Sequence, residues 1–388
     1  MRSRALWLLA VASLGACSSS AGAPGAGPEA EAGGTVDGQG TVDSGAAADG
    51  PGDAATGDSH TTSDAVSGGD AGGYPHWACV AAYATPSSRD AATWPFSGDS
   101  PWNTPIGDGA ALEAATGACT KDIATSPSGM GVNSHEWSHP VYLAVTSDPL
   151  ANLYQNGMLV DGMVHAPASA TPALPPPPTT DAHLHIVDPA HHFLDEMWEA
   201  SKVSDGWSSQ AWAKSDLHGP GVGQGGVRAY GGSAIGGLVR VGELASEIRH
   251  AMAFAIDQSQ QKNSWVWPAT TNDNAAAGNY MGHLPMGQLI AIPSTVDLCS
   301  LSLTSAGLVV ARALQDYGAY LVDSSGGLAL YAEPRVEDDA TVGEATLLNA
   351  ARGDLMKIVA QLRCVTNSDA GHVGGGGSRR APPAPMLQ

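Results

Sequence analysis

Short apolar stretches with a period of two, separated by turn-forming residues, constrain the fold of this chain more than any other feature. From Tyr74 onward apolar and polar residues mostly alternate, and clusters of Gly, Pro, Asp and Ser interrupt the pattern. The chain contains 49 Gly and 26 Pro among its 388 residues. Because alternate residues of a strand face opposite sides of a sheet, this pattern predicts many short strands. We therefore expect a mainly β fold.

Helices are expected in the later part of the sequence. Thr304 is suited to cap a helix that ends near Tyr317. Thr341–Glu344 resembles a capping box, and Asp354 is expected to start a last helix whose apolar stripe ends at Cys364. Many strands with few helices predict a β-sandwich or jelly-roll-like domain with some C-terminal helices. The expected strands are Pro140–Val145, His183–Val187, Phe193–Trp198, Gly237–Arg240, Ile248–Ile256, Trp265–Trp267 and Leu289–Ile292.

The first 17 residues have the features of a secretory leader. Arg2 and Arg4 precede the apolar run Ala5–Leu14, which is too short to span a membrane. Residues 14–17 read L-G-A-C, which resembles the lipobox of bacterial lipoproteins. This resemblance implies cleavage before Cys17 and acylation of that residue. In the same group Ser18 implies the outer membrane, so we expect a lipid-anchored protein at the cell surface; a plain leader with a chance cysteine is the alternative.

Residues 18–73 have the composition of a flexible tether. They contain nine acidic residues among Gly, Ala, Ser and Thr, and they lack Lys, Arg and aromatic residues. Such a segment buries too little apolar surface to offset its ordering entropy, so we expect disorder; a calcium-binding acidic repeat is the alternative. We expect residues 74–365 to form one β-rich domain and residues 366–388 to form a disordered tail.

The charge balance excludes one class of partner. Lys and Arg total 17 against 38 Asp and Glu, a net charge of −21. A chain with so few cations does not neutralise a phosphate backbone, so no nucleic acid partner is expected. After the leader no apolar run of about 18 residues occurs, so membrane contact is expected through the lipid anchor alone.

The cysteines are suited to an oxidising compartment. With Cys17 acylated, the four cysteines that remain form an even number. Three pairings are open, and we expect the nearest neighbours to pair. The alternative, a four-cysteine zinc site, lacks the usual C-x₂-C spacing. The expected disulfides are Cys79–Cys119 and Cys299–Cys364.

Three short motifs match well-known patterns without their context. Residues 135–139 read H-E-W-S-H, but His139 precedes Pro140, which disfavours the helix that a zinc protease needs. Residues 221–226 match G-x-G-x-x-G without a preceding strand or following helix. Residues 231–235 lack the last glycine of a nucleophile elbow. We therefore expect neither a zinc protease nor a nucleotide site.

The stretch from Asp181 to Trp198 carries the richest set of reactive side chains. His183 and His185 lie two residues apart on an expected strand, so they share one face. A short turn then places His185 opposite Glu196, and His183 opposite Trp198. This set is suited to proton transfer, to holding a metal ion or to gripping a sugar ring. Asp181, His183, His185 and Glu196 are candidate catalytic residues, and Trp198 is a candidate substrate-binding residue.

Other interpretations of this stretch remain open. In the first alternative, the strand face that carries His183 and His185 is a polar outer surface without a site. A His-x-His metal centre is another, although the glutamate spacing typical of cupins is absent. A register slip of one residue would exchange Glu196 and Trp198 for Asp195 and Met197. We predict no metal and no cofactor.

His250 and Glu243 are further candidates, each with a structural alternative. His250 lies on the apolar face of the strand expected at 248–256, where a core histidine is common. It becomes an acid or base if that strand approaches the groove of Glu196. Glu243 lies in an expected turn, where a cap or a surface charge is the alternative.

Several motifs resemble a group of uncharacterised secreted bacterial proteins. They lie at 94–105 (W-P-F-S-G-D-S-P-W-N-T-P), 236–243 (G-G-L-V-R-V-G-E), 249–254 (R-H-A-M-A-F) and 313–323 (A-L-Q-D-Y-G-A-Y-L-V-D). The resemblance covers most of residues 94–332 and implies homology without supplying a reaction. The group reads Asp-Gly-His-Met near residue 181, where this chain has Ala182 and Leu184. The positions that recur in the group are Asp181, His183, Glu196, Trp198, Glu243 and His250.

The sequence as a whole favours a surface enzyme that acts on an extracellular polysaccharide. Export, a β-rich scaffold, and carboxylates near histidines all fit this interpretation. A hydrolase would use two carboxylates, whereas a lyase would use a His or Tyr base and a group that neutralises a uronate. A non-catalytic glycan-binding or structural lipoprotein is the alternative.

Overall fold

The computed structural model describes residues 77–126, 129–174, 181–273, 277–334 and 344–388. The leader, Cys17, the tether and most of the expected capping box at 341–344 lie outside these residues. Within them the protein is mainly β with few helices, as the sequence predicts, and the arrangement is sandwich-like. None of the helices described is both long and apolar enough to cross a membrane.

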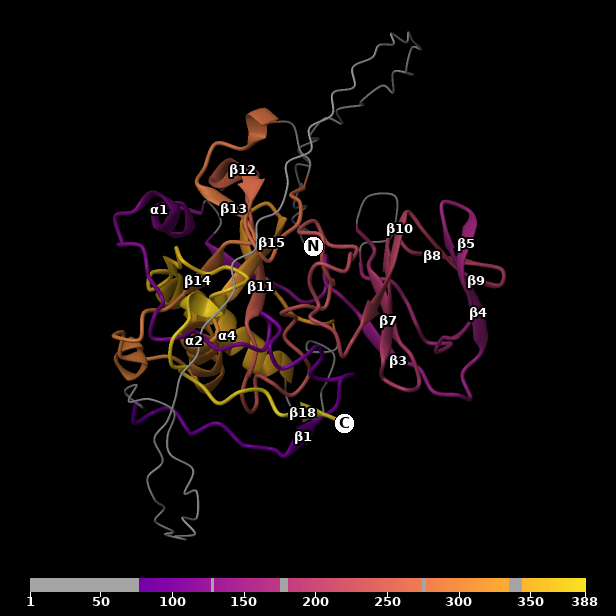
Figure 1. The fold of residues 1–388 in the computed structure, drawn as a ribbon, viewed down its shortest axis with the longest axis horizontal. Coiled ribbons are helices and arrows are strands. Elements are labelled where there is room, and N and C mark those ends of the chain that lie inside the picture. The colour runs from indigo at the N-terminus through magenta and orange to yellow at the C-terminus, as the bar shows by residue number, and fades with distance from the viewer. Residues whose placement is uncertain (1–76, 127–128, 175–180, 274–276, 335–343) are drawn as a thin grey trace, which may run out of the picture. The chain divides into compact units, whose positions relative to one another are not determined.

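A six-stranded mixed sheet with two helices forms the larger core (Figure 1). Its strand order is β17-β14-β15-β11-β16-β2, and β11 in the middle is buried throughout. The helices α2 and α4 pack on each other and contact strands β14 and β2 respectively. The strands are β2 (Met130–Asn133), β11 (Met252–Ile256), β14 (Leu289–Ala291), β15 (Ala319–Ser324), β16 (Leu328–Tyr331) and β17 (Arg363–Cys364); the helices are α2 (Ser305–Asp316) and α4 (Glu344–Val359).

Two four-stranded sheets pack face to face around a second core. The middle sheet has the order β10-β7-β6-β3, and the outer sheet has the order β5-β4-β9-β8. Leu184, Ile186 and Met197 of the middle sheet meet Leu153 and Trp207 of the outer sheet. The strands are β3 (Val141–Leu143), β4 (Leu150–Gln155), β5 (Met158–His165), β6 (Leu184–Val187), β7 (Phe193–Trp198), β8 (Ser201–Val203), β9 (Gly206–Ser209) and β10 (Ala211–Asp216).

The remaining elements are short. They are the strand pair β12 (Gln261–Trp265) and β13 (Leu284–Met286), the pair β1 (Ser88–Arg89) and β18 (Met386–Leu387), the helix α1 (Ala118–Ala124), and the 3₁₀ turns η1 (Gln258–Gln260), η2 (Ala277–Asn279), η3 (Leu298–Leu301) and η4 (Val373–Gly375).

The middle sheet is buried on both faces. The predicted hairpin register is confirmed, because His185 pairs with Glu196 and Val187 pairs with Leu194. Leu184 and Ile186 point into the sandwich, so by strand alternation His185 and Val187 point to the other side. Val187 and Leu194 belong to the larger core. The face that carries His185 is therefore an interior face and not a polar outer surface.

The strand predicted at 237–240 does not form, and the reason lies in close packing; of the strand predicted at 265–267, only Trp265 lies in a strand. Residues 237–240 form turns with a single bridge between Val239 and Ala332. Gly237 has φ +72°, and a Cβ there would lie 2.3 Å from the amide nitrogen of Ala253. A Cβ on Gly236 would lie 2.5 Å from the ring of Trp102. The motifs at 94–105 and 236–243 therefore contact each other. This close packing explains the glycines at 236 and 237.

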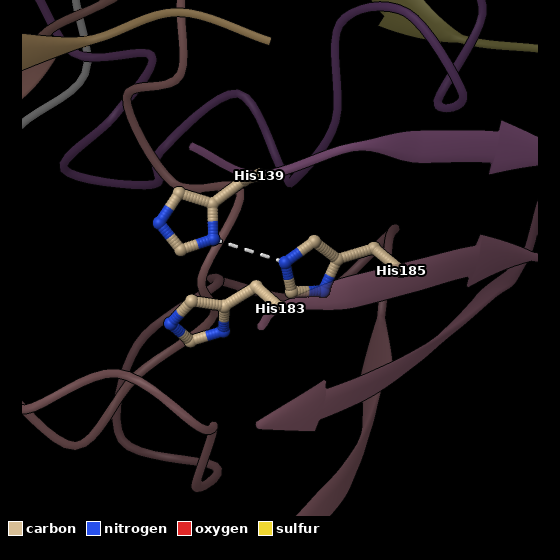
Figure 2. Close-up of side chains that lie close together, drawn as sticks. All are labelled: His139, His183 and His185. Atoms are coloured by element: carbon tan, nitrogen blue, oxygen red, sulfur yellow. Dashed lines mark hydrogen bonds between the residues drawn. The ribbon is translucent and has the colours of Figure 1, made fainter. Parts of the chain in front are cut away.

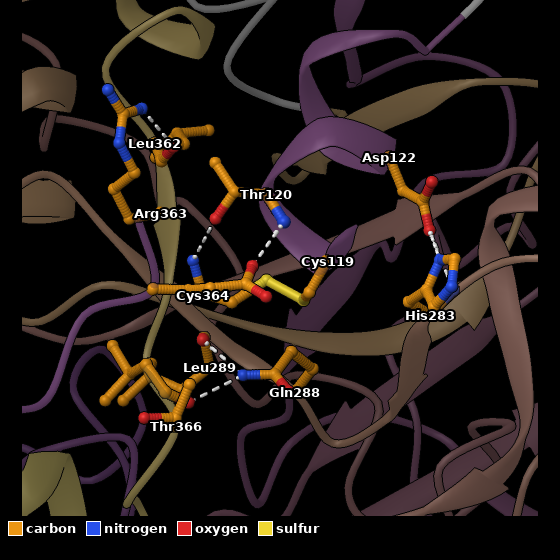
Figure 3. The surroundings of a disulfide bond; sticks show 12 residues. Cys119, Thr120, Asp122, His283, Gln288, Leu289, Leu362, Arg363, Cys364 and Thr366 are labelled. Carbon is orange, nitrogen blue, oxygen red and sulfur yellow. Dashed lines mark hydrogen bonds and ion pairs between the residues drawn. A yellow bond between two sulfur atoms is a disulfide. The ribbon is translucent and has the colours of Figure 1, made fainter. Parts of the chain in front are cut away.

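Both predicted disulfide pairings are wrong, although all four cysteines are paired. One bond joins Cys79 to Cys299, and the other joins Cys119 to Cys364, as Figure 3 shows. Cys119 lies in α1, which packs on β17, where Cys364 follows Arg363. The tertiary contact of α1 with β17 decides this pairing, and sequence proximity does not. A four-cysteine zinc site is excluded by these bonds.

The expected disordered tail is also wrong for residues 366–388. The segment folds back on the domain, and β18 pairs in parallel with β1. The guanidinium of Arg380 donates to the carbonyl of Gln315 at 2.9 Å. Gly375 packs so tightly on Ala110 that a Cβ would lie 2.4 Å from its Cα. The domain therefore extends to the last residue described.

The N-terminus of α2 is capped from two sides. Thr304 accepts from the amide of Gly307, as predicted. Asp354, expected to start the last helix, lies instead inside α4 and is buried. Its Oδ2 accepts from the amide of Thr304 at 2.6 Å and from its hydroxyl at 2.7 Å. Burial raises the pKa of Asp354, but the two bonds from Thr304 and the Lys357 ammonium outweigh it and lower the pKa.

Asp354→Ala should lower the free energy of unfolding by about 1–2 kcal/mol, because Thr304 loses its partner at the start of α2. The pKa of Asp354 is lowered in the folded state, so its contribution is present above about pH 4 and is lost as the pH falls through the folded value. Urea unfolding at pH 7 and at pH 3 measures both effects. Asp99→Ala, which removes an exposed carboxylate, is the control; an equal loss in both variants would contradict the assignment.

Candidate functional site

Three buried histidines converge where the middle sheet meets the larger core; we call His139, His183 and His185 the histidine cluster (Figure 2). Strands β3 and β6 are parallel, and Val141 pairs with His185. His139 lies two residues before Val141, and His183 lies two residues before His185. These two rings therefore face each other, with centroids 4.2 Å apart. Nδ1 of His139 lies 3.0 Å from Nε2 of His185. Parallel pairing thus builds the cluster from two distant segments.

The cluster is held neutral by its surroundings. Burial is the main cause that lowers the pKa of all three imidazoles, and the charge of Arg228 lowers each further. The pKa of His185 falls to about 3. At neutral pH these rings therefore act as hydrogen-bond partners or ligands and not as cations.

Arg228 fixes the tautomer of His139. Its Nη1 donates to Nε2 of His139, so the proton of that ring is on Nδ1, which donates to His185. The Nε of Arg228 contacts Asp323 at 3.0 Å, and the guanidinium lies 3.7 Å from the ring centre of Tyr331. Burial raises the pKa of Asp323 to about 7, although the charge of Arg228 opposes the change. The result is a fixed chain of donors from Arg228 to His185.

A pocket of about 620 Å³ lies beside this cluster. Asp181, Trp137 and Tyr331 line it, and the ring of Tyr331 also contacts His139 at 5.5 Å between centroids. Asp181 accepts from Nε1 of Trp198 at 3.1 Å. Of the residues that the sequence analysis grouped near position 181, Asp181 lines this pocket, whereas His183, His185 and Trp198 do not.

Glu196 does not share this environment, although the register is as predicted. Its side chain is buried, and it accepts from the hydroxyls of Ser215 and Ser233 and from the amide of Ala234 at 2.7 Å. Burial raises its pKa, and these hydrogen bonds reduce the shift. The carboxylate thus ties β7 to the loop at 233–234, which is a positioning role. The expected hydrogen bond between Glu196 and an imidazole is replaced by these three bonds.

A second cleft, of about 740 Å³, is lined by Glu243, and we call it the Glu243 cleft; His250 is buried next to Glu243 and does not line the cleft itself. Nε2 of His250 lies 3.1 Å from Oε1 of Glu243, and Nδ1 lies 2.9 Å from the carbonyl of Ala251. Burial lowers the pKa of His250, but the charge and hydrogen bond of Glu243 outweigh it and raise the pKa. His250 was expected within the strand at 248–256. It instead precedes β11, which begins at Met252. It does not reach Glu196 either.

A second carboxylate lines the Glu243 cleft. Glu333 accepts from the amide of Val241 at 2.9 Å, and Glu243 accepts from the preceding amide, that of Arg240, at 2.7 Å. Neighbouring amides therefore hold the two carboxylates close together. The guanidinium of Arg240 contacts Glu333 at 3.3 Å. The turn at 240–243, which includes the turn position expected for Glu243, is what brings the pair into one cleft.

An aromatic side chain and two further charges complete the cleft. Trp94 lines it beside Arg249, whose guanidinium lies 4.7 Å from the ring centre of Trp94. Arg249 also contacts Glu247 at 3.7 Å. Nε1 of Trp94 donates to Asn103 at 2.7 Å, so the motif at 94–105 fixes the position of the indole.

Comparison of the chain with protein-family models, with curated proteins and with solved structures finds no match. The chemistry of both sites is therefore argued from their own geometry.

Several residues of these sites were missed by the sequence analysis. His139 had a signal, because it lies two residues before a strand and so shares the alternation of His183 and His185. It was considered only as part of the H-E-x-x-H pattern. Arg228 and Tyr331 had no signal, since their segments lie far from residue 181 in sequence. The other missed residues are Trp94, Asp323 and Glu333.

Glu196→Ala should lower the free energy of unfolding by about 2–3 kcal/mol, because two hydroxyls and one amide lose a buried acceptor. Chemical denaturation of the purified protein measures this change. Asp99→Ala, at an exposed position, is the control and should stay within about 0.5 kcal/mol of the parent. A stable Glu196→Ala protein that has lost all activity would instead assign Glu196 to catalysis.

Proposed function

We propose that the protein is a glycan-cleaving enzyme whose reaction takes place in the Glu243 cleft. The observation that carries the proposal is the pair of carboxylates, Glu243 and Glu333, held on consecutive amides in one cleft beside His250. Paired carboxylates are the usual machinery of glycoside hydrolysis. Trp94 supplies an aromatic surface in the same cleft, of the kind on which sugar rings stack.

The two carboxylates have different partners, which assigns them different roles. The raised pKa of His250 lets it share a proton with Glu243, and this pair delivers that proton to the glycosidic oxygen. Glu333, whose charge Arg240 balances, acts as the nucleophile at the anomeric carbon, and the departing sugar leaves with the proton from the Glu243–His250 pair. Water then displaces Glu333 from the anomeric carbon and returns a proton to the Glu243–His250 pair.

Hydrolysis is favoured over elimination by the state of the two arginines. A lyase needs a cation that is free to neutralise a uronate carboxylate. Arg240 contacts Glu333 and Arg249 contacts Glu247, so both guanidinium groups in the cleft already have a carboxylate partner. The second candidate is a non-catalytic glycan-binding protein. It is supported by Trp94 in the Glu243 cleft and by Trp137 in the pocket of about 620 Å³, since each offers an aromatic surface to a sugar ring.

Glu333→Gln and Glu243→Gln should each lower kcat by about 1,000-fold or more, and His250→Gln by about 100-fold. The activity should fall as the pH rises through the pKa of His250, which lies above the ordinary imidazole value of about 6.5. The assay is a screen of soluble polysaccharides, read by reducing ends and by ultraviolet absorbance for unsaturated products.

The control for this series is Glu136→Gln, an exposed glutamate outside the Glu243 cleft, which should keep the parent's activity. If unsaturated products were detected, the assignment as a hydrolase would be wrong and the enzyme would be a lyase. Polysaccharide binding that is unaffected by Glu333→Gln, with no product from any substrate, would support the binding protein instead.

We also propose that acylated Cys17 anchors the enzyme at the cell surface, which would place the cleft among extracellular polysaccharides. The lipobox at 14–17 and the acidic composition of residues 18–73 support this location. Cys17→Ser should move the protein from the membrane fraction to the soluble fraction with its unfolding transition unchanged. Immunoblots of the two fractions measure the shift, and a variant that stays with the membrane would contradict the anchor.

A further inference from the structure

The geometry of the histidine cluster points to a site for one divalent transition-metal ion. We infer that His139, His183 and His185 bind a single Zn²⁺-like ion, separate from the Glu243 cleft. One ligand nitrogen of each ring lies within 4.8 Å of the others, and Nδ1 of His139 lies 3.0 Å from Nε2 of His185. With Zn–N bonds of 2.0–2.1 Å, tetrahedral ligands lie about 3.3 Å apart, so side-chain shifts of under 2 Å assemble the site.

Orphaned nitrogens in the cluster provide the second observation. Nδ1 of His183 and Nδ1 of His185 are buried and have no hydrogen-bond partner. A buried polar atom without a partner is costly, and such atoms in native proteins commonly mark an ion or water. Each neutral imidazole carries one lone pair, on Nδ1 or on Nε2 according to its tautomer, so each ring can offer one nitrogen to a metal ion. Figure 2 shows the three rings next to one another, with the hydrogen bond that joins His139 to His185.

The donor set decides the class of metal. Three imidazoles suit zinc and its neighbours in the first transition row, whereas calcium and magnesium prefer oxygen ligands. Three protein ligands also leave a fourth position open, as in catalytic zinc sites. Tyr331 contacts His139 and also lines the pocket of about 620 Å³, so this residue joins the cluster to that pocket.

The positive charge of Arg228 opposes the binding of a metal cation nearby. The other contacts of its guanidinium show how both charges can be accommodated. Its guanidinium has other acceptors in Asp323 at 3.0 Å and in the carbonyl of Ala234 at 3.2 Å. When the metal replaces the proton on Nδ1 of His139, that proton moves to Nε2, and Arg228 turns toward these two acceptors. The carboxylate of Asp323 balances part of the added charge.

The test is the metal content of the full chain, purified without chelators and measured by elemental analysis. We expect about one equivalent of metal, removable by a chelator and restored by Zn²⁺ alone. Substitution with Co²⁺ should give the visible absorption of a tetrahedral nitrogen site. His185→Gln and His183→Gln should each weaken Zn²⁺ binding by about 100-fold or more. Each Gln keeps much of the volume of the buried ring.

The control is His283→Gln, which removes an exposed imidazole that pairs with Asp122 and should leave the stoichiometry at one. Circular dichroism of each variant separates loss of a ligand from loss of folding. Metal below about 0.1 equivalent in the folded parent, with no rise in Tm on adding Zn²⁺, would overturn the inference. Glu333→Gln should retain the metal, so loss of glycan cleavage and loss of metal binding are separate outcomes.

Discussion

Burial of the middle sheet on both faces is the constraint on which the rest of the structure depends. One face fills the sandwich with Leu184, Ile186 and Met197, and the other meets the larger core through Val187 and Leu194. Any polar residue on this second face must find a partner or carry a desolvation penalty. Glu196 finds three donors, whereas the cluster contains nitrogens without partners. That contrast separates a structural polar residue from a candidate binding site on one surface.

Local patterns predicted the parts of the fold that local chemistry decides. Alternation and turn residues were sufficient for the hairpin of β6 and β7, with its register, and for the start and end of α2. They failed for residues 237–240, where two glycines pack against Trp102 and Ala253. They also failed for the disulfides and the C-terminal segment, because both depend on contacts between residues more than 200 positions apart. Nothing in a single sequence ranks such contacts.

The candidate sites divide in the same way. Glu243 and His250 were both predicted as candidates, and they form a pair because the chain folds back on itself between these two positions, which are seven residues apart. Glu333 joins them only because Ala332 bridges to Val239, which no local pattern indicates. Likewise His183 and His185 were found, whereas His139 needed the parallel pairing of β3 with β6. The sequence therefore predicts pairs within a segment, and the topology supplies the partner from elsewhere.

The bond between Cys79 and Cys299 has a mechanical consequence. Cys79 is the third residue described after the N-terminal region, so tension on the chain before residue 77 reaches a covalent link almost at once. The load passes to η3 and on to α2, without first peeling away the segment that carries Trp94. A protein held by its N-terminal end under fluid shear would keep its Glu243 cleft intact until the larger core itself gives way. In a protein attached in this way, the crosslink would therefore take up the load before it reached the residues of the Glu243 cleft.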